Sequence, residues 1–235
     1  MKGLAGKRVI VTGGSSGIGA AAVERFRAEG CHVTDLSRHP GSGGIACDVG
    51  DRSQVESALG RVGPVDVVVN NAGISFRHRA VDITPDEWQQ VLRTNLTGAF
   101  NVAQVAGRQI IDSDGEGVII NVASTNALVG HPHYADYNAT KAALLALTRT
   151  LALEWAPLVR VNAVCPGYVL TPMQEAEYTP DMIDAVNGKI PLRRHARPDE
   201  LAALFAFMAS DDCTYMTGAS VVLDGGETAG GLASR

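Results

Sequence analysis

Residues 8–19 have the sequence RVIVTGGSSGIG, and this stretch decides the fold of the 235-residue chain. The apolar run Arg8–Val11 predicts a strand, and the spacing of apolar residues after it predicts a helix over Gly17–Glu29 that stops at Gly30. A glycine cluster between a strand and a helix is typical of a dinucleotide-binding turn, with an ordinary strand-to-helix turn as the alternative.

Each glycine of the cluster has an expected part in holding a dinucleotide. Gly13 permits the tight turn, Gly17 lets the backbone approach a pyrophosphate, and Gly19 allows the helix to pack closely on the strand. The first turn of the helix presents free N–H groups and the positive end of its dipole to the phosphates.

Short apolar runs alternate with helical patterns along the rest of the chain. The further predicted strands are His32–Leu36, Ile45–Cys47, Val65–Val69, Gly117–Val122, Val159–Val164 and Ser220–Leu223. The further predicted helices are Arg52–Arg61, one or two helices from Thr84 (a cap) to about Ile111, Tyr134–Trp155, a small one at Thr179–Gly188 over the site, and Pro198–Ala209. This alternation predicts one α/β domain over residues 1–235, a Rossmann-type doubly wound parallel sheet of about seven strands with helices on both faces. The glycine-rich segment Gly225–Arg235 is expected to fray or to contact another subunit.

Composition excludes several classes of protein. The net charge is −5 without a long basic run, so we expect no nucleic-acid partner. No apolar run reaches the roughly 18 residues of a membrane span, and the N-terminus has no leader pattern, so a cytoplasmic location is expected. The four cysteines lack metal-binding spacing, which predicts no metal site, and three of them adjoin strand-like runs, where a free cysteine is usually buried.

Further motifs follow in order at the predicted strand ends and on the helices between them. They are Asn70-Asn71-Ala72-Gly73, Asn95-Leu96-x-Gly98, Asn121-Val122-Ala123-Ser124, Tyr137-x-x-x-Lys141, Pro166-Gly167, Thr171-Pro172-Met173 and Asp224-Gly225-Gly226. With the glycine turn, they make the chain resemble the short-chain dehydrogenase/reductase family over nearly its full length. The resemblance implies an NAD(P)(H)-dependent oxidoreductase that interconverts a secondary alcohol and a ketone, such as a ketoreductase or an alcohol or sugar dehydrogenase, assembled as a homodimer or homotetramer.

The catalytic set is expected around Tyr137. Its phenol has an ordinary pKa near 10, and Lys141, four residues on and therefore on the same helix face, is expected to lower that pKa and stabilise the phenolate. The resemblance further implies that Ser124 polarises the substrate oxygen, that Lys141 holds the nicotinamide ribose, and that Asn95 completes a proton relay through water. A non-catalytic dinucleotide-binding sensor or scaffold on the same fold is the alternative function.

The preference between NADP and NAD depends on the end of the second strand. Ser37 and Arg38 occupy the position where an acid would favour NAD, so NADP is favoured; Asp35 can share the face of Ser37 and leaves NAD open. Asp48 matches the family position that binds adenine, with a helix N-cap as the alternative. The whole expected cofactor-binding set is Gly13, Ser15, Ser16, Gly17, Ile18, Gly19, Ser37, Arg38, Asp48, Val49, Asn70, Ala72, Gly73, Tyr137, Lys141, Pro166, Gly167, Val169 and Thr171.

The substrate is expected beside Ser124 and Tyr137, within walls formed by the segments around Phe76, His131 and Tyr168. Arg77 and the histidines there suit an anionic or polyhydroxylated substrate, unless they face solvent or another subunit. The candidate substrate-binding residues are Ser124, Tyr137, Phe76, Arg77, His131 and Tyr168.

Overall fold

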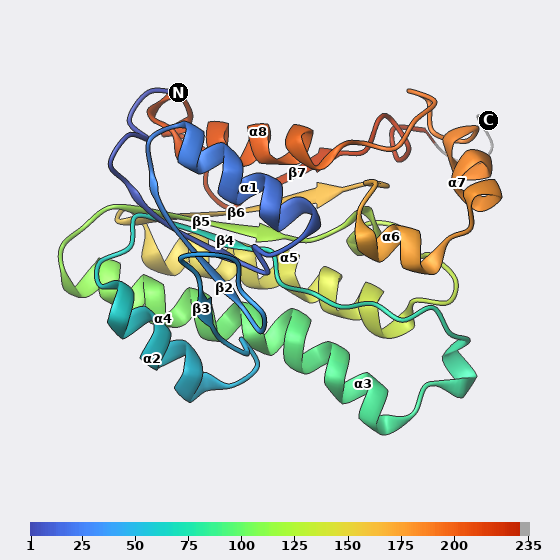
Figure 1. The fold of residues 1–235 in the computed structure, drawn as a ribbon, viewed down its shortest axis with the longest axis horizontal. Coiled ribbons are helices and arrows are strands. Elements are labelled where there is room, and N and C mark those ends of the chain that lie inside the picture. Colours follow the sequence, from blue (N-terminus) through green and yellow to red (C-terminus); the bar gives the residue numbers. More distant parts are fainter. Residues whose placement is uncertain (231–235) are drawn as a thin grey trace.

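A computed structural model describes residues 1–230 and shows a seven-stranded sheet in which every pair of neighbouring strands is parallel (Figure 1). The strand order is β3-β2-β1-β4-β5-β6-β7. The strands are β1 (Arg8–Thr12), β2 (His32–Ser37), β3 (Ile45–Ala46), β4 (Val67–Asn70), β5 (Gly117–Val122), β6 (Val159–Pro166) and β7 (Ser220–Leu223). The predicted fold class is confirmed; residues 231–235 of the expected domain and tail lie outside the described part.

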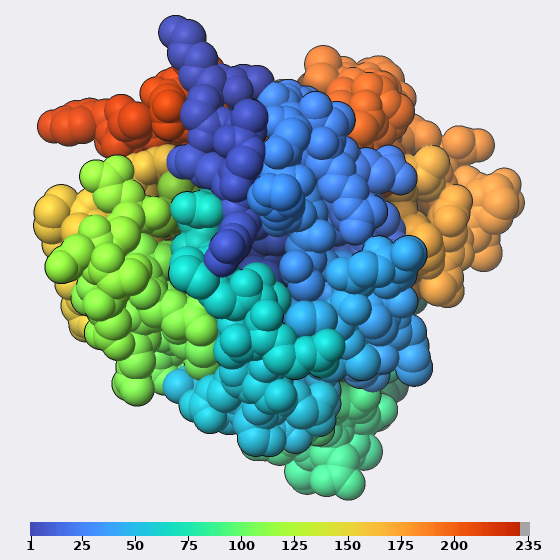
Figure 2. Space-filling model, turned by 60° about the vertical axis from the view of Figure 1, so that its left-hand side comes forward, coloured from blue at the N-terminus to red at the C-terminus, as the bar shows by residue number. Residues whose placement is uncertain are grey.

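Helices cover both faces of the sheet. Helices α1 (Gly17–Ala28) and α8 (Pro198–Ala209) pack together on one face, and α2 (Arg52–Val62), α4 (Gly98–Asp112) and α5 (Ala135–Trp155) cover the other. Helix α3 (Pro85–Leu92) follows its N-cap Thr84, the cap that the sequence predicted, and the Thr84 side chain forms a capping box with Glu87. Helices α6 (Pro172–Glu177) and α7 (Pro180–Asn187) form a lobe that projects from the body (Figure 2).

The alternation of side chains along the central strands creates two cores. Val9 and Val11 of β1 pack against α1 and α8, whereas Ile10, between them in sequence, packs against α2 and α4 on the opposite face. All three side chains are essentially inaccessible to solvent. A strand buried on both faces reads as a continuous apolar run, which is why residues 9–11 show no polar alternation.

The crevice for a ligand arises between β1 and β4. Both strands are parallel neighbours, but β1 leads to β2 on one side and β4 leads to β5 on the other. The connections therefore diverge to opposite faces at their carboxyl ends. In open parallel sheets this switch in strand order is where ligands bind.

The segment between Thr84 and Asp112, expected to hold one or two helices, is two α-helices joined by the π-helical turn Arg93–Thr97. Helix α6, directly after Thr171, differs from the sequence-based expectation, because it was not predicted as a helix. The four cysteines are free and buried, as expected. Within residues 1–230, the structure contains no helix with the length and hydrophobicity needed to traverse a bilayer.

Two helical glycines provide a matched test of packing at the glycine turn. A Cβ on Gly19 would lie 2.1 Å from the carbonyl oxygen of Gly13, whereas a Cβ on Gly60 of α2 would have nothing within 4 Å. We expect Gly19→Ala to destabilise the fold by more than about 2 kcal/mol through overpacking. Gly60→Ala should stabilise it by about 0.5–1 kcal/mol, because alanine favours the helix.

Urea unfolding of both variants beside the parent protein measures these changes. An unfolding midpoint of Gly19→Ala at or above that of the parent protein would show that the close contact at the turn is not a constraint.

Candidate active site

The glycine turn between β1 and α1 has the backbone that a phosphate site requires. Gly13 and Gly17 have φ angles of +66° and +52°, a left-handed region that favours glycine. The N-cap residue of α1, Ser16, makes no side-chain capping hydrogen bond to the helix. The first N–H groups of α1 are thus available to an anion at the positive end of the helix dipole.

Hydrogen bonds fasten this turn to the segment after β4. The hydroxyl of Thr12 accepts from the backbone N–H groups of Asn71 at 3.0 Å and Ala72 at 2.9 Å. The Asn71 side chain donates in return to the carbonyl oxygens of Thr12 at 3.0 Å and Gly13 at 3.3 Å. The two strand ends that border the crevice are therefore held at a fixed separation.

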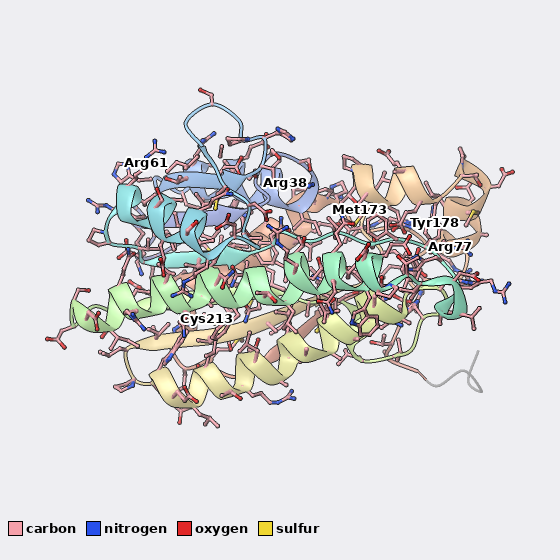
Figure 3. The ribbon with its side chains drawn as sticks, turned by 90° about the horizontal axis from the view of Figure 1, so that it is seen from below. Arg38, Arg61, Arg77, Met173, Tyr178 and Cys213 are labelled. Carbon is pink, nitrogen blue, oxygen red and sulfur yellow. The ribbon has the colours of Figure 1, made fainter. Side chains whose placement is uncertain are left out.

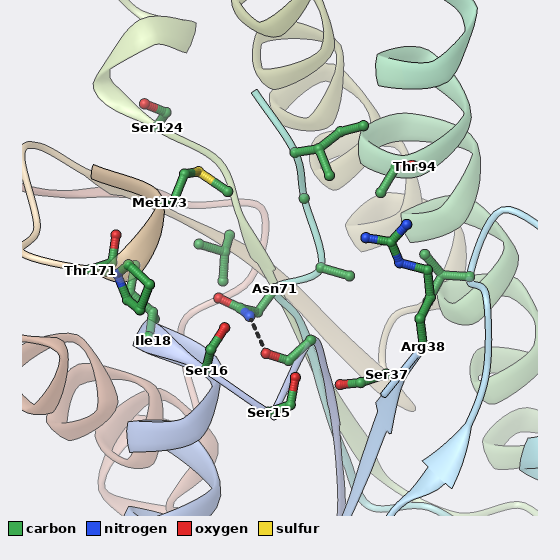
Figure 4. A pocket seen from close by; sticks show the side chains of 18 of the residues that line it. Ser15, Ser16, Ile18, Ser37, Arg38, Asn71, Thr94, Ser124, Thr171 and Met173 are labelled. Atoms are coloured by element: carbon green, nitrogen blue, oxygen red, sulfur yellow. Dashed lines mark hydrogen bonds between the residues drawn. The ribbon is translucent and has the colours of Figure 1, made fainter. Parts of the chain in front are cut away.

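A groove of about 410 Å³ runs along the carboxyl ends of the strands (Figure 4). Figure 4 shows Ser15, Ser16 and Ile18 of the glycine turn on one side, Arg38 and Thr94 on another, and Ser124 with Met173 farther along. Most of the residues expected to bind a dinucleotide line this groove: Gly13, Ser15, Ser16, Gly17, Ile18, Ser37, Arg38, Asp48, Val49, Ala72, Gly73, Tyr137, Lys141, Pro166, Gly167, Val169 and Thr171.

Two residues of the expected cofactor set are not among those that line the groove. Gly19 lies behind the turn, where it permits the close approach of α1 to Gly13. Asn70 is buried, and its side-chain amide donates to the carbonyl oxygen of Ala99 at 3.1 Å and to Asn121 Oδ1 at 3.0 Å. The structure places both residues in support of the groove.

Asp48 lies at the end of the groove beyond Ser37. Its Oδ2 accepts from Arg93 at 2.7 Å and its Oδ1 accepts from the N–H of Gly50 at 2.9 Å. The alternative role of helix cap belongs instead to Asp51, which accepts from Ser53 and Gln54 at the start of α2. Arg93 was not singled out from the sequence, because its contact with Asp48 joins segments 45 residues apart.

The carboxylate of Asp35 is occupied by groups of its own chain. The side chain is buried beneath the glycine turn, where Oδ1 accepts from the N–H of Gly14 at 2.8 Å and from the hydroxyl of Ser37. Oδ2 accepts from the N–H of Gly41 at 3.3 Å. Asp35 is not among the groove-lining residues, whereas Arg38 is, and its guanidinium points into the pocket (Figure 4).

Ser124, Tyr137 and Lys141 converge where the groove meets the start of α5. The Ser124 hydroxyl donates to Asn126 Oδ1 at 3.1 Å and accepts from the N–H of Asn126 at 3.1 Å, and its proximity lowers the pKa of Tyr137. Lys141 Nζ lies 5.4 Å from the centre of the Tyr137 ring and donates to the carbonyl oxygen of Val122 at 2.7 Å. The serine at the end of β5 and the two helical residues thus form one cluster.

Burial dominates the electrostatics of this cluster. It raises the pKa of Tyr137 to about 12, although the neighbouring Ser124 hydroxyl opposes this shift. Burial lowers the pKa of Lys141 to about 8. Desolvation disfavours both charged forms. In the protein alone, the pKa of Tyr137 is therefore raised and not lowered as expected, and Lys141 is not among the groups that shift it.

Asn95 lies in the π-helical turn between α3 and α4, a kind of irregularity that is common at functional sites. Its side chain is buried; Oδ1 accepts from the N–H of Ile74 at 2.8 Å, and Nδ2 donates to the Ile74 carbonyl oxygen at 2.9 Å and to Thr140 Oγ1 at 3.3 Å. A Cβ on Gly73 would lie 3.4 Å from Asn95 Oδ1 and 3.6 Å from Lys141 Nζ. Asn95 and Lys141 therefore border the same small space.

A second cavity of about 100 Å³ adjoins the groove at Ser124 and Tyr137. His131 and Tyr168 line it, as expected, with their ring centres 6.2 Å apart. Phe76 and Arg77 are exposed and are not among its lining residues. Six further lining residues lie in segments that the sequence placed at the pocket, but they were not named individually: Ser75, Tyr134, Met173, Gln174, Glu177 and Tyr178. Most of these belong to α6 and its end, and the pair Thr171-Pro172, a cap followed by proline, was the signal that could have revealed that helix.

Comparison with known proteins agrees with this geometry. A family model described as enoyl-(acyl carrier protein) reductase matches residues 13–228. The chain is 37% identical to 3beta-hydroxysteroid dehydrogenase 1 of Eggerthella lenta, over 96% of this chain and 95% of that protein. It is 36% identical to L-xylulose reductase of Bos taurus, over 95% and 97% respectively. The ligand-free structure of Thermoplasma acidophilum aldohexose dehydrogenase superposes with a TM-score of 0.91 and 34% identity, covering 97% of this chain and 96% of that one.

The chain belongs to the short-chain dehydrogenase/reductase family. It is an NAD(P)-dependent oxidoreductase that acts on the CH–OH group of alcohols and on the corresponding carbonyl compounds. The comparisons favour this activity over a non-catalytic sensor or scaffold.

The start of α5 in this short-chain dehydrogenase/reductase is anchored by a buried carboxylate. Asp136 is inaccessible to solvent; Oδ1 accepts from the N–H of Tyr137 at 2.7 Å, and Oδ2 lies 3.1 Å from His78 Nε2. The backbone N–H of His78 also donates to the carbonyl oxygen of His133 at 3.1 Å. The segment after Gly73 is therefore tied to the helix turn that carries Tyr137.

Removal of the anchor should loosen the site as well as the fold. We expect Asp136→Ala to cost about 2–4 kcal/mol of unfolding free energy, because buried groups on His78 and Tyr137 lose their acceptor. Asp82→Ala is the control, since the exposed Asp82 contacts only exposed Arg79 at 3.7 Å. Thermal unfolding measures both changes. Equal melting temperatures for the two variants would contradict the anchoring role.

Proposed function

We propose that this short-chain dehydrogenase/reductase prefers NADP(H) and uses Tyr137 as its acid–base group, with Ser124, Lys141 and Asn95 in support. The observation that carries the NADP preference is the internal use of the Asp35 carboxylate. Bound to the Gly14 N–H and the Ser37 hydroxyl, the carboxylate is buried beneath the turn and does not line the groove, so it is not presented to a ribose 2′-hydroxyl. Arg38 lines the groove and supplies a cation suited to a 2′-phosphate.

The residues present fit a dinucleotide. The positive φ angles of Gly13 and Gly17 and the uncapped first turn of α1 suit a pyrophosphate, and Asp48 suits adenine at the far end. Ala72, Gly73, Lys141, Pro166, Gly167, Val169 and Thr171 would border the nicotinamide half. When bound, the nicotinamide accepts a hydride from an alcohol carbon or delivers one to a carbonyl carbon.

The protein's own groups then handle the proton. In alcohol oxidation, the Tyr137 phenolate takes the hydroxyl proton as the C–H bond gives up its hydride and the C=O bond forms. In ketone reduction, the Tyr137 phenol donates its proton to the oxygen. Ser124 hydrogen-bonds the same oxygen and Tyr137, and the Lys141 ammonium stabilises the phenolate. We assign the space beside Gly73 to a water that links Lys141 and Asn95 in the relay.

We also propose a homodimer or homotetramer in the cytoplasm. Leu153 on α5 is 83% exposed and Phe100 on α4 is 37% exposed, which places apolar side chains on the outer surface of the two long helices. Val222 on the edge strand β7 is 40% exposed. Such surfaces favour closed symmetric association, and the four free cysteines suit a reducing compartment.

Loss of the phenol should abolish turnover without abolishing cofactor binding. Tyr137→Phe is expected to lower kcat by about 10²–10⁴-fold, the usual contribution of general acid–base catalysis. Absorbance at 340 nm follows turnover, and quenching of protein fluorescence follows binding of NADPH. Tyr215→Phe is the control, because Tyr215 is fully exposed. Near-normal turnover of Tyr137→Phe would contradict the role of Tyr137 as the acid–base group.

A charge reversal at the groove should change the cofactor preference. Arg38→Asp is expected to lower the ratio of kcat/KM with NADPH to kcat/KM with NADH by about 10- to 100-fold, because the variant loses the charge-assisted hydrogen bonds to the 2′-phosphate. Arg61→Asp is the matched control, since exposed Arg61 lies on α2, away from the groove, as Figure 3 shows. An unchanged ratio for Arg38→Asp would exclude this arginine as the discriminating group.

A further inference from the structure

The cavity beside Ser124 and Tyr137 is small and is closed on one side by α6. At about 100 Å³ it is well below the 300–1,000 Å³ typical of pockets for drug-sized ligands. Met173, Gln174 and Glu177 of α6 form one wall. Figure 3 shows Met173 and Tyr178 near one another at the end of the molecule where α6 lies. A substrate that reaches Tyr137 through this cavity has to be a small molecule.

The lining of the cavity is rich in hydroxyl groups and contains a single carboxylate. Within residues 1–230, no lysine or arginine is among its lining residues. The hydroxyl and amide side chains are those of Ser75, Ser124, Thr125, Asn126, Tyr134, Tyr137, Tyr168, Thr171, Gln174 and Tyr178. An anionic substrate would find no cationic side chain among the described lining residues and would face Glu177.

Glu177 is held in place as an acceptor. Oε1 accepts from the hydroxyl of Ser75, and Oε2 accepts from the hydroxyl of Tyr134 at 2.7 Å. Burial and the hydrogen bond to Glu177 raise the pKa of Tyr134, so its phenol remains a neutral donor. A carboxylate has about four acceptor positions, and these two bonds leave capacity for a hydroxyl donated by a substrate.

Two other polar atoms of the cavity wall have no hydrogen-bond partner. Gln174 Nε2 and His131 Nε2 are both buried without one, and His131 Nε2 lies 3.9 Å from Glu227 Oε1, beyond hydrogen-bond distance. Burial lowers the pKa of His131, so the imidazole is neutral. Buried polar atoms are nearly always paired, and unpaired ones call for an explanation. A ligand with hydroxyl groups, each able both to donate and to accept, would satisfy Gln174, His131 and Glu177 together.

We propose that Glu177 determines specificity by accepting a hydrogen bond from a substrate hydroxyl remote from the reacting carbon, which selects small, neutral, polyhydroxylated ketones and alcohols over keto acids and phosphorylated compounds. This inference rests on the proposed function of the same site. It replaces the anionic alternative that Arg77 suggested, because Arg77 is exposed and does not line the cavity.

A panel of four-carbon ketones tests the substrate class with the whole protein and NADPH. Erythrulose, butanone and 2-oxobutanoate have the same chain length. Erythrulose carries hydroxyl groups, 2-oxobutanoate carries a carboxylate, and butanone has no polar group besides its carbonyl. We expect kcat/KM to be highest for erythrulose. Turnover of butanone or 2-oxobutanoate with a kcat/KM equal to or above that of erythrulose would overturn the inference and leave the proposed function standing. Absence of turnover with every ketone and, in reverse, with every alcohol would overturn both.

Substitution of Glu177 tests the residue itself. Glu177→Gln should lower the ratio of kcat/KM for erythrulose to that for butanone by about 10- to 100-fold, the usual effect of losing a charged hydrogen-bond partner. Glu175→Gln is the matched control, since Glu175 lies on the same helix, is exposed and does not line the cavity. An unchanged ratio in Glu177→Gln would overturn the assignment.

The pH profile gives a second measurement that a purely structural role would not move. Tyr137 is bordered by Ser124, Lys141 and Tyr134, and the negative charge of Glu177 raises the pKa of Tyr137. Alcohol oxidation requires the phenolate and therefore increases with pH. Removal of the Glu177 charge lowers the pKa of Tyr137. The pH at which alcohol oxidation reaches half of its maximal rate should therefore shift to lower values in Glu177→Gln, and it should equal that of the parent protein in Glu175→Gln. Equal pH midpoints for Glu177→Gln and Glu175→Gln would contradict the electrostatic effect of Glu177 on Tyr137.

If Glu177→Gln fails to fold, Gln174→Leu tests the same cavity. This variant keeps the approximate volume and removes the unpartnered amide, and the ratio of erythrulose to butanone kcat/KM should fall about tenfold, as for a lost neutral hydrogen bond. A ratio within about twofold of the parent value would overturn the proposed recognition of hydroxyl groups.

Discussion

The exchange of hydrogen bonds between Thr12 and Asn71 is the constraint on which the cofactor groove depends. The hydroxyl of Thr12 accepts from two consecutive N–H groups after β4, and the amide of Asn71 returns two bonds to the carbonyl oxygens at the end of β1. Strand pairing fixes the distance between the two strands only as far as Val11 and Val69. Beyond that point these side chains keep the crevice edges in register, so the glycine turn and the segment around Gly73 face the same space.

Desolvation sets the chemical character of the catalytic cluster. The same burial that raises the pKa of Tyr137 to about 12 lowers that of Lys141 to about 8. The two shifts oppose ionisation of both side chains, but with a pKa of about 8 Lys141 keeps its proton at neutral pH, so the protein alone holds a neutral phenol beside an ammonium group. A bound nicotinamide cation would favour the phenolate in the oxidative direction, which couples proton removal to the presence of the oxidised cofactor.

The sequence predicts those parts of the site that lie next to their own strand ends. The glycine turn, Gly73, Ser124 and the Tyr137/Lys141 pair follow apolar runs or share one helix turn, so the apolar pattern places them, while the role of Ser124 came from the family resemblance. Contacts between distant segments were beyond that reasoning. Arg93 meets Asp48 across 45 residues, and Glu177 meets Ser75 across 102. The hydrogen bond from the Gly14 N–H to the Asp35 carboxylate also depends on how β2 lies under the turn. Strand alternation alone left open whether Asp35 faces the turn or the cofactor.

Helix α6 has a consequence for how this enzyme can diverge. The helix is held by its own cap, Thr171, and by Pro172 at its start, and none of its residues is fully buried. Both hydrophobic cores are formed almost entirely by other elements. Replacements at exposed or half-buried positions usually alter stability little. The wall that faces the substrate is therefore nearly independent of the folding core, and natural or laboratory selection can exchange its side chains to redirect the enzyme without having to rebuild the scaffold.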